Sequence, residues 1–140
     1  NADRCLWRDK NSVIVRASDG SYKGIVWNLS LETKQKEIEI TVTLPAFAEK
    51  RVSLLIKTVD EKTCNPLKVW HDLGEPANLA GRQIELLQSA AKPLVTTELL
   101  NGKAPKVTLK AGPNAVIYFE AAPAPLTSDN CYDYSFYEKM

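Results

Sequence analysis

The chain has 140 residues, of which 44% are hydrophobic and 25% are charged, and its formal net charge is +1. This length suits one domain with a sizeable core, and we expect residues 1–140 to form it. The near-neutral charge argues against a nucleic-acid partner and against an acidic membrane surface. No apolar run approaches the roughly 20 residues that span a bilayer, so no membrane partner is expected.

The first half of the chain shows the patterns of antiparallel strands. Residues 12–16 and 24–29 are apolar runs on either side of a glycine-containing turn signal, which predicts a hairpin. We expect Trp27 to face the core. Residues 37–44 alternate aliphatic side chains with glutamate and threonine, the pattern of a strand with one face in the core and the other in water. Residues 52–59 predict a more fully buried strand.

Residues 65–92 are the one long part of the chain with helical rather than strand-like spacing. Asn65 is followed by a proline and can cap a short helix, and Asn78 can cap a longer helix that Pro93 ends. We expect this helical excursion to cover one edge of the sheets. Trp70 occupies a helical core position and is expected to be buried.

Strand patterns return after the helices, in residues 95–99, 106–110 and 115–121, with Asn-Gly and Gly-Pro-Asn turn signals between them. The chain therefore contains about seven or eight short strands. We predict an all-β fold, an antiparallel two-sheet β-sandwich interrupted by the helical excursion. The predicted core residues are Ile38, Ile40, Val42, Val52, Leu54, Ile56, Ile117 and Phe119.

Residues 122–140 form a proline-containing tail that is rich in aromatic residues. Tyr132, Tyr134 and Phe136 alternate along it, so they can line one face of an added strand. Together with Tyr137 they are unusual for a free polar tail, because disordered segments are poor in aromatic residues. We expect them to be buried on their own sandwich, on a neighbouring copy through self-association, or on another domain.

The titratable residues form no recognisable catalytic set. His71 is the only histidine and precedes Asp72, but adjacent residues on a helix do not face each other, so an exposed histidine is expected. Glu37 and Glu39 share a strand face and alternate with Ile38 and Ile40. This alternation is typical of a strand whose polar face is exposed to solvent, so it does not indicate a catalytic pair. The chain has no glycine-rich phosphate loop and no GxSxG or HExxH motif. We predict no catalytic residue, no metal site and no cofactor.

Two covalent modifications remain open. Cys5 and Cys131 lie near the two chain ends, which often meet in compact domains, so they can form a disulfide. The alternative is that these two and Cys64 are all free thiols. Asn28 begins an Asn-Leu-Ser sequence that fits the glycosylation pattern, but an asparagine at the end of a strand is the favoured interpretation.

Several short motifs follow one another between about residues 13 and 121. They are Asp19-Gly20, Ile25 to Asn28, Ile56 to Asp60, Cys64 to Pro66, Val69-Trp70, Leu73 to Pro76, Asn78, Gln83 and Gly112 to Val116. Their order and spacing resemble the carboxy-terminal β-sandwich of family 39 glycoside hydrolases, which include β-xylosidases and α-L-iduronidases. The Cys-Asn-Pro motif is most similar to the iduronidase-like branch.

The resemblance implies that catalysis belongs to a (β/α)₈ barrel preceding the sandwich, where two glutamates act in a retaining mechanism. Such a barrel needs about 250 residues, so it does not fit in this chain, and no residue here matches the catalytic pair. The resemblance therefore implies a non-catalytic accessory domain that supports or packs on a barrel. Trp70, Phe136 and Tyr137 are the residues that we expect to contact this partner.

A carbohydrate-binding module is the alternative, because such modules are often β-sandwiches that stack sugar rings on exposed aromatic side chains. Trp7, Tyr132 and Tyr134 are the candidates for this role. An exposed, coplanar pair of aromatic side chains on one sheet face would favour glycan binding. Its absence would favour a scaffolding role.

Overall fold

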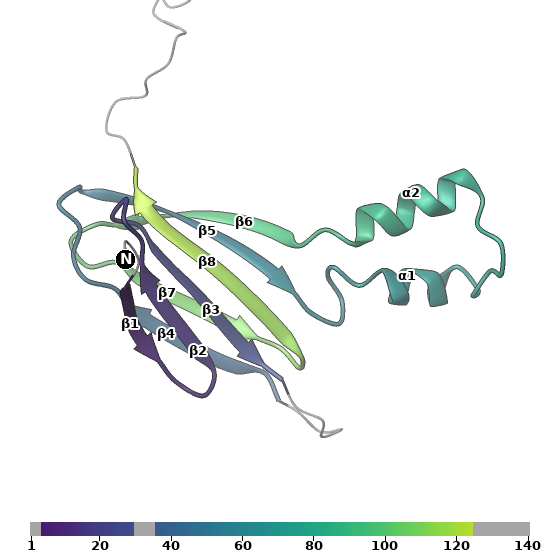
Figure 1. Ribbon diagram of the computed structural model, residues 1–140, viewed down its shortest axis with the longest axis horizontal. Coiled ribbons are helices and arrows are strands. Elements are labelled where there is room, and N and C mark those ends of the chain that lie inside the picture. The colour runs from purple at the N-terminus through teal and green to yellow at the C-terminus, as the bar shows by residue number, and fades with distance from the viewer. Residues whose placement is uncertain (1–3, 30–35, 125–140) are drawn as a thin grey trace, which may run out of the picture.

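The computed structural model describes residues 4–29 and 36–124, and every structural statement below concerns these residues. They form eight strands and two short helices (Figure 1). The elements are β1 Arg4–Arg8, β2 Ser12–Arg16, β3 Tyr22–Asn28, β4 Ile38–Thr43, β5 Arg51–Val59, α1 Pro66–Asp72, α2 Gly81–Ala90, β6 Leu94–Asn101, β7 Lys106–Ala111 and β8 Ala115–Pro123.

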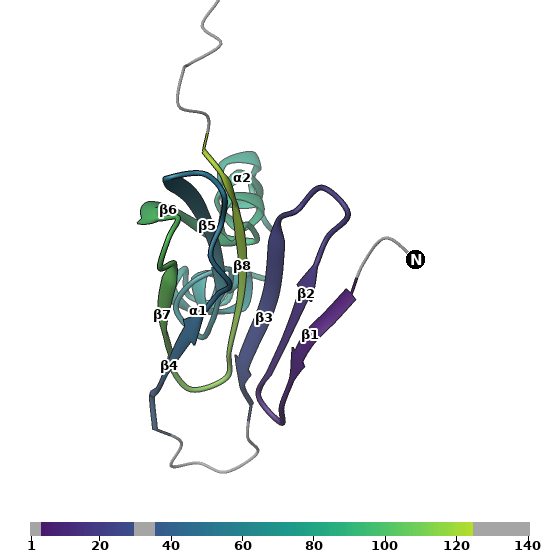
Figure 2. The ribbon, with the colours of Figure 1, turned by 90° about the vertical axis from the view of Figure 1, so that its left-hand side faces the viewer.

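The strands form two antiparallel sheets that pack face to face. Six strands make the larger sheet in the order β1-β2-β3-β8-β5-β6, and β4 pairs with β7 in the smaller one. Figure 2 shows the two-stranded sheet lying against one face of the larger sheet. The predicted antiparallel β-sandwich is confirmed, and each strand predicted between residues 12 and 121 is present. The added strand expected in the aromatic tail lies outside the described residues.

The core lies between the two sheets and is built from alternate residues of each strand. Of the predicted core residues, Val52, Leu54, Ile117 and Phe119 are buried. The other four are partly buried and pack against the buried cluster: Ile38, Ile40, Val42 and Ile56. Three of these belong to β4, which borders the open side of the small sheet and therefore keeps some contact with solvent.

Trp27 does not face the core, so the sequence-based expectation for this residue is wrong. In β3 the buried positions are Tyr22, Gly24, Val26 and Asn28, which places Trp27 on the opposite face, where it is half-buried. The register with β8 has a steric reason. A side chain at position 24 would overlap the ring of Phe119. The arrangement in which the even-numbered residues of β3 face the core therefore needs a glycine at this position.

Asn28 closes the end of β3 and is only 5% exposed. Its Nδ2 atom donates to the carbonyl oxygens of Lys36 at 2.9 Å, Ala111 at 3.0 Å and Gly112 at 3.1 Å. These bonds join β3 to the end of β7 and to the start of the β4 segment. The side-chain nitrogen that glycosylation would modify is buried, which confirms the strand-end interpretation.

The two helices begin where hydrogen bonds satisfy their free amides. Asn65 caps α1 as predicted, and its Oδ1 atom accepts from the backbone N–H of Lys68 at 3.2 Å. α2 begins later than the sequence indicated, because its N-cap is Ala80 rather than Asn78. The Oε1 atom of Gln83 accepts from the Ala80 N–H at 2.9 Å and supplies the capping contact from inside the helix.

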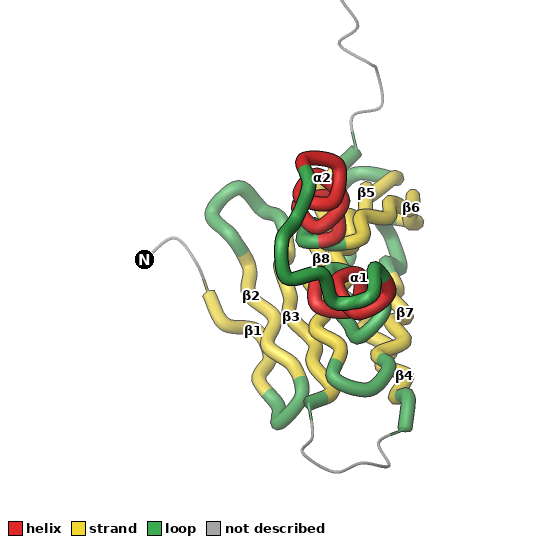
Figure 3. The backbone as a smooth tube through the Cα atoms, turned by 90° about the vertical axis from the view of Figure 1, so that its right-hand side faces the viewer, coloured by secondary structure: helices red, strands yellow, loops and turns green. Residues whose placement is uncertain are grey.

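The helices do not cover an edge of the sheets, so the expectation that residues 65–92 would do so is wrong. β5 and β6 are adjacent antiparallel strands, so the chain leaves and returns at the same end of the sheet. The two helices pack on each other and project away from the sandwich (Figures 1 and 3). We call α1, α2 and their connection the helical arm. Neither helix contains a buried residue, and no helix in the described part of the chain is long and apolar enough to cross a membrane.

Candidate docking surface

The larger sheet has apolar side chains on both of its faces. One face packs on β4 and β7, and the other, which we call the outer face, points away from them. The strand registers place ten apolar or aromatic residues on the outer face: Val13, Val15, Ile25, Trp27, Leu55, Val59, Val95, Leu99, Val116 and Tyr118. An antiparallel sheet that covers one core normally presents polar residues on its other face.

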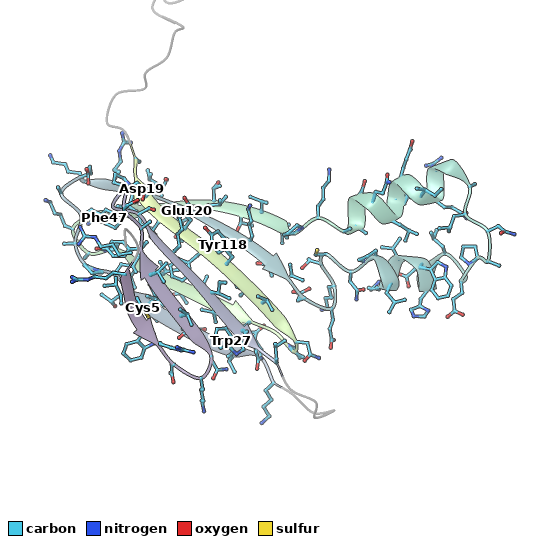
Figure 4. The ribbon with its side chains drawn as sticks, in the orientation of Figure 1. Cys5, Asp19, Trp27, Phe47, Tyr118 and Glu120 are labelled. Atoms are coloured by element: carbon cyan, nitrogen blue, oxygen red, sulfur yellow. The ribbon has the colours of Figure 1, made fainter. Side chains whose placement is uncertain are left out.

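Aromatic and aliphatic side chains meet across neighbouring strands at the centre of the outer face. Ile25 pairs directly with Tyr118, and Trp27 pairs with Val116, on strands β3 and β8. Figure 4 labels Trp27 on β3 and Tyr118 on β8. Ile25 is 44% exposed and Leu99 on β6 is 57% exposed. The apolar residues of β2, β3 and β8 are adjacent to one another, whereas Lys57 and Ser53 of β5 separate them from Val95 and Leu99 of β6. Adjacent exposed apolar residues mark an interaction site more often than scattered single residues do.

The centre of this face also carries polar side chains: Tyr118, Glu120 and the exposed Lys57, which lies directly opposite Tyr118 on β5. The Tyr118 hydroxyl donates to the Oε2 atom of Glu120 at 3.0 Å. Glu120 lies directly opposite Lys23 in the β3–β8 register, so its charge has an opposite charge across the strand pair. Burial and the interactions with Glu120 raise the pKa of Tyr118, which keeps the hydroxyl protonated as a donor.

The entrance to the helical arm is held by a compact set of hydrogen bonds. The Oδ1 atom of Asp60 accepts from the backbone N–H groups of Thr63 at 2.7 Å and Lys62 at 2.8 Å, and from the Thr63 hydroxyl at 2.9 Å. Burial of Asp60 opposes its ionisation, but these hydrogen bonds outweigh it and lower its pKa. Cys64 then joins the two ends of the arm, because its Sγ atom donates to the Ala91 carbonyl at 3.1 Å.

Trp70 is half-buried in the arm, so the expectation that it is fully buried is wrong. The arm stands clear of the sandwich and α1 packs mainly on α2, which leaves too little protein around the indole to bury it. Its Nε1 atom donates to the Pro76 carbonyl at 3.2 Å, which fixes the ring against the turn between the helices. The prediction that Trp70 contacts a partner stays a prediction.

His71 is exposed, as predicted, and lies next to Glu75 rather than Asp72. Its Nδ1 atom is 2.6 Å from the Oε1 atom of Glu75, and Asp72 instead forms an ion pair with Lys68 at 2.7 Å. Both pairs are spaced four residues apart on the surface of the arm, where such contacts commonly form. Within residues 4–29 and 36–124 no group of three or more His, Cys, Asp or Glu residues is arranged to hold a metal ion.

The predicted sugar-binding residues are only partly within the described chain. Trp7 lies on β1 and is 56% exposed. Tyr132 and Tyr134 lie outside the described residues, as do the predicted partner contacts Phe136 and Tyr137, so their roles stay predictions. The same holds for the Cys5–Cys131 disulfide: Cys5 is exposed on β1, and Cys131 lies outside the described residues.

Two pairs of aromatic rings lie in contact within the described residues. Tyr22 and Phe47 meet edge to face, with centroids 5.3 Å apart at 90°, and both are buried in the core. The rings of Trp70 and His71 are tilted by 53° on the arm. Neither is an exposed coplanar pair on a sheet face, which is the feature that would favour glycan binding.

The outer face was missed by the sequence reasoning, although a signal for it exists. Residues 25–27 and 115–119 are apolar at odd and even positions alike, so both faces of each strand are apolar. In a strand with one solvated face, apolar and polar residues alternate. Continuous apolar runs are typical of strands that are covered on both faces. The two runs therefore predict strands with apolar residues on both faces.

A sequence model of the glycosyl hydrolases family 39 matches residues 3–104 of this chain. The chain belongs to glycosyl hydrolase family 39. The resemblance inferred from its motifs is therefore confirmed. This family 39 chain is 34% identical over 101 residues to a β-xylosidase from Geobacillus stearothermophilus, an alignment that covers 69% of this chain and 19% of that enzyme.

Solved structures of family 39 proteins share the fold. The family 39 enzyme from Xanthomonas axonopodis pv. citri superposes with a TM-score of 0.71 at 17% identity, over 86% of this chain and 28% of that enzyme. A monomeric β-xylosidase from Caulobacter crescentus CB15 gives a TM-score of 0.69 at 17% identity, over 84% and 27% of the two chains. A bacterial orthologue of human α-L-iduronidase gives 0.64 at 16% identity, over 87% and 24%.

Proposed function

We propose that this chain is the non-catalytic accessory β-sandwich of a xylosidase-like or iduronidase-like family 39 glycoside hydrolase, and that its outer face docks on a catalytic (β/α)₈ barrel. The observation that carries the proposal is the six-stranded sheet with two apolar faces, of which β4 and β7 cover only one. The fraction of the relatives that the chain spans, from 19% to 28%, supports it, because those enzymes contain much more protein.

Docking is favourable because the outer face is largely apolar, with charges at Lys23, Lys57 and Glu120, and is already ordered. Each square ångström of apolar surface removed from water contributes about 25 cal/mol. The backbone of this sheet loses little conformational entropy on binding, because strand pairing already holds it. Tyr118 and Glu120 are hydrogen-bonded to each other, so their polar atoms have a partner when water is excluded.

The helical arm extends the same contact. It carries exposed apolar side chains on both helices and their connection: Leu67, Leu79, Ile84 and Leu86. The hydrogen bonds of Asp60 and Cys64 hold its entrance, and that of Trp70 holds its far turn. We assign the arm, with Trp70, to the barrel contact. Tyr137 retains the same proposed role.

A binding titration tests the outer face. We expect this chain to bind the Geobacillus stearothermophilus β-xylosidase produced without its matching segment, and Ile25→Lys to weaken the affinity at least about tenfold, or about 1.4 kcal/mol. The lysine places a charge in the centre of the apolar contact. Thr41→Lys is the matched control, because Thr41 is exposed on β4 of the other sheet and should leave the affinity unchanged.

Both variants must keep the wild-type unfolding midpoint for the comparison to count as a binding effect. Equal affinity of the two variants, or no binding by the wild-type chain, would show that the outer face is not the docking surface. Isothermal calorimetry gives the affinities, and circular dichroism gives the midpoints.

A separate prediction is that the purified chain hydrolyses no glycoside. A retaining mechanism needs two carboxylates about 5–5.5 Å apart on either side of the bond that is cleaved. The hollow beside β1 and β4 has one carboxylate in its wall, Asp9. Release of nitrophenol from aryl xylosides and iduronides measures the activity. Turnover that disappears when a carboxylate of this chain is replaced would contradict the proposed role.

Glycan binding is the second candidate function, and Trp7 is the observation in its favour. Its indole is the most exposed aromatic side chain among the large hydrophobic residues of the described chain. Sugar-binding surfaces normally combine such a ring with free hydrogen-bonding side chains. Asp9 and Asn11, which line the same hollow as Trp7, are hydrogen-bonded to the backbone, which makes the docking role better supported.

A further inference from the structure

A groove of about 510 Å³ opens between the two sheets beside β1. The groove exists because the larger sheet is wider: its strands β2 and β1 extend past the β4 edge of the two-stranded sheet (Figure 2). One wall carries the apolar residues Leu6, Trp7 and Ile14, and the other carries Ile40, Val42 and Leu44.

The second wall of the groove is a strand edge. Among the described residues β4 pairs with β7 alone, so its other edge lies along the groove. The backbone N–H of Leu44 donates to the Pro105 carbonyl at 3.0 Å. Because antiparallel strands direct alternate residues toward and away from a neighbour, Thr43 and Thr41 turn their backbone groups toward the groove.

Two of the polar side chains that line the groove, Asp9 and Asn11, are hydrogen-bonded to backbone, and the other polar lining residues are Ser12, Thr41 and Thr43. The Nδ2 atom of Asn11 donates to the Trp27 carbonyl at 3.1 Å, and the Oδ1 atom of Asp9 accepts from the Lys10 N–H at 2.7 Å. The groove therefore offers two apolar walls and a row of backbone donors and acceptors. This combination fits an added β-strand better than a sugar, which needs polar side chains around its hydroxyl groups.

We propose that residues 132–136 of this same chain fill the groove as a third strand beside β4. These residues alternate Tyr132, Tyr134 and Phe136 with Asp133 and Ser135. The three aromatic side chains match the apolar walls, and the two polar ones match the exposed threonines of β4. Each buried aromatic side chain removes about 150–250 Å² from water.

The point where the chain leaves β8 requires only a short connection to the groove, and it sets the direction of the added strand. The N–H of Ala124 donates to the Arg51 carbonyl at 3.0 Å, so the tail leaves beside the start of β5, at the end of the sandwich where β4 finishes. Residues 125–131 span up to about 25 Å when extended. A strand that enters from this end runs antiparallel to β4, as the neighbouring pairs do.

The same end of the sandwich carries Cys5. Arg4 pairs with Arg16, Arg16 pairs with Tyr22, and Tyr22 pairs with Ala121, so the start of β1 lies level with the last residues of β8. A tail that enters the groove here brings Cys131 to the end where Cys5 lies. The placement is therefore compatible with the predicted pairing of the two thiols, and it does not depend on that bond.

Hydrogen exchange in the full chain tests the proposal, at a concentration where light scattering gives the mass of a monomer. We expect the amides of Thr41 and Thr43 to exchange at least about tenfold more slowly than free peptide amides. Tyr134→Asp should abolish that protection, because it places a charge against the apolar walls. Ser135→Asp is the matched control one residue away and should retain it. The Ile117 amide in β8 must stay protected in every variant, which shows that the sandwich is folded.

Four results would overturn the proposal. The two threonine amides could exchange freely in the wild-type chain, or their protection could survive Tyr134→Asp. Protection that appears only with dimer formation would assign the groove to a second copy, and protection that appears only with added xylo-oligosaccharide would assign it to a glycan. None of these measurements requires a catalytic barrel, so their failure is independent of the docking role of the outer face.

Discussion

Leu54→Ala is expected to lower the free energy of unfolding of the isolated chain by about 2–5 kcal/mol. Leu54 lies in β5 and is 1% exposed, among the largest fully buried side chains of the core. β5 has strands on both sides, with Ala121 of β8 and Glu98 of β6 directly opposite Leu54. The surrounding backbone therefore cannot collapse into the space that the substitution leaves, and most of the cavity remains.

Leu55→Ala is the control, because it removes the same atoms one residue along the same strand. Leu55 lies on the outer face and is only partly buried in this chain. Its substitution should cost clearly less, since fewer contacts are lost and no internal cavity forms. Urea unfolding followed by tryptophan fluorescence gives both values. A near-neutral midpoint for Leu54→Ala, or equal losses for the two variants, would contradict the assignment of the core face of β5.

Gly102→Ala is expected to destabilise the chain by about 3 kcal/mol, at the upper end of the usual range for overpacking. A Cβ atom at this position would overlap the backbone oxygen of Glu49. The segment around Glu49 cannot easily withdraw. The Gly102 N–H donates to the Lys50 carbonyl at 2.7 Å, and the Gly102 carbonyl accepts from the Phe47 N–H at 2.7 Å.

Gly112→Ala, in the turn between β7 and β8, is the matched control. A Cβ atom at Gly112 would have no neighbour within 4 Å, so the added methyl group should change the unfolding free energy little. Thermal unfolding of the two variants compares them directly. Equal melting temperatures would show that the turn after β6 does not pack against the 44–50 segment as described.

The strands and their approximate limits could be predicted wherever one face is polar. Alternation over residues 37–44 identified β4, found at Ile38–Thr43, and the predicted run 12–16 coincides with β2. β1 was not predicted, because its sequence Arg-Cys-Leu-Trp-Arg has no alternation to read. It is a strand because it pairs with β2, and that pairing is a tertiary property.

For the candidate sites, the sequence was informative about family and weak about surfaces. The ordered motifs from Asp19 to Val116 indicated family 39, which the family match confirms. Several of those residues determine local shape rather than chemistry: Asp60 holds the entrance to the arm and Asn65 caps α1. Their spacing can be read from sequence because each acts within a few residues of its partner.

The sequence by itself determined the fold class, the antiparallel strands and the family, because these depend on local alternation, turn residues and short-range motifs. Only the tertiary structure decided which face of β3 is buried. Residues 25–27 are apolar at every position, so either parity satisfies the pattern, and the close approach of Phe119 to Gly24 selects one. That choice turns Ile25 and Trp27 outward and creates the outer face. The projection of the arm and the groove beside β4 likewise follow from how strands distant in sequence pair, which no local pattern records.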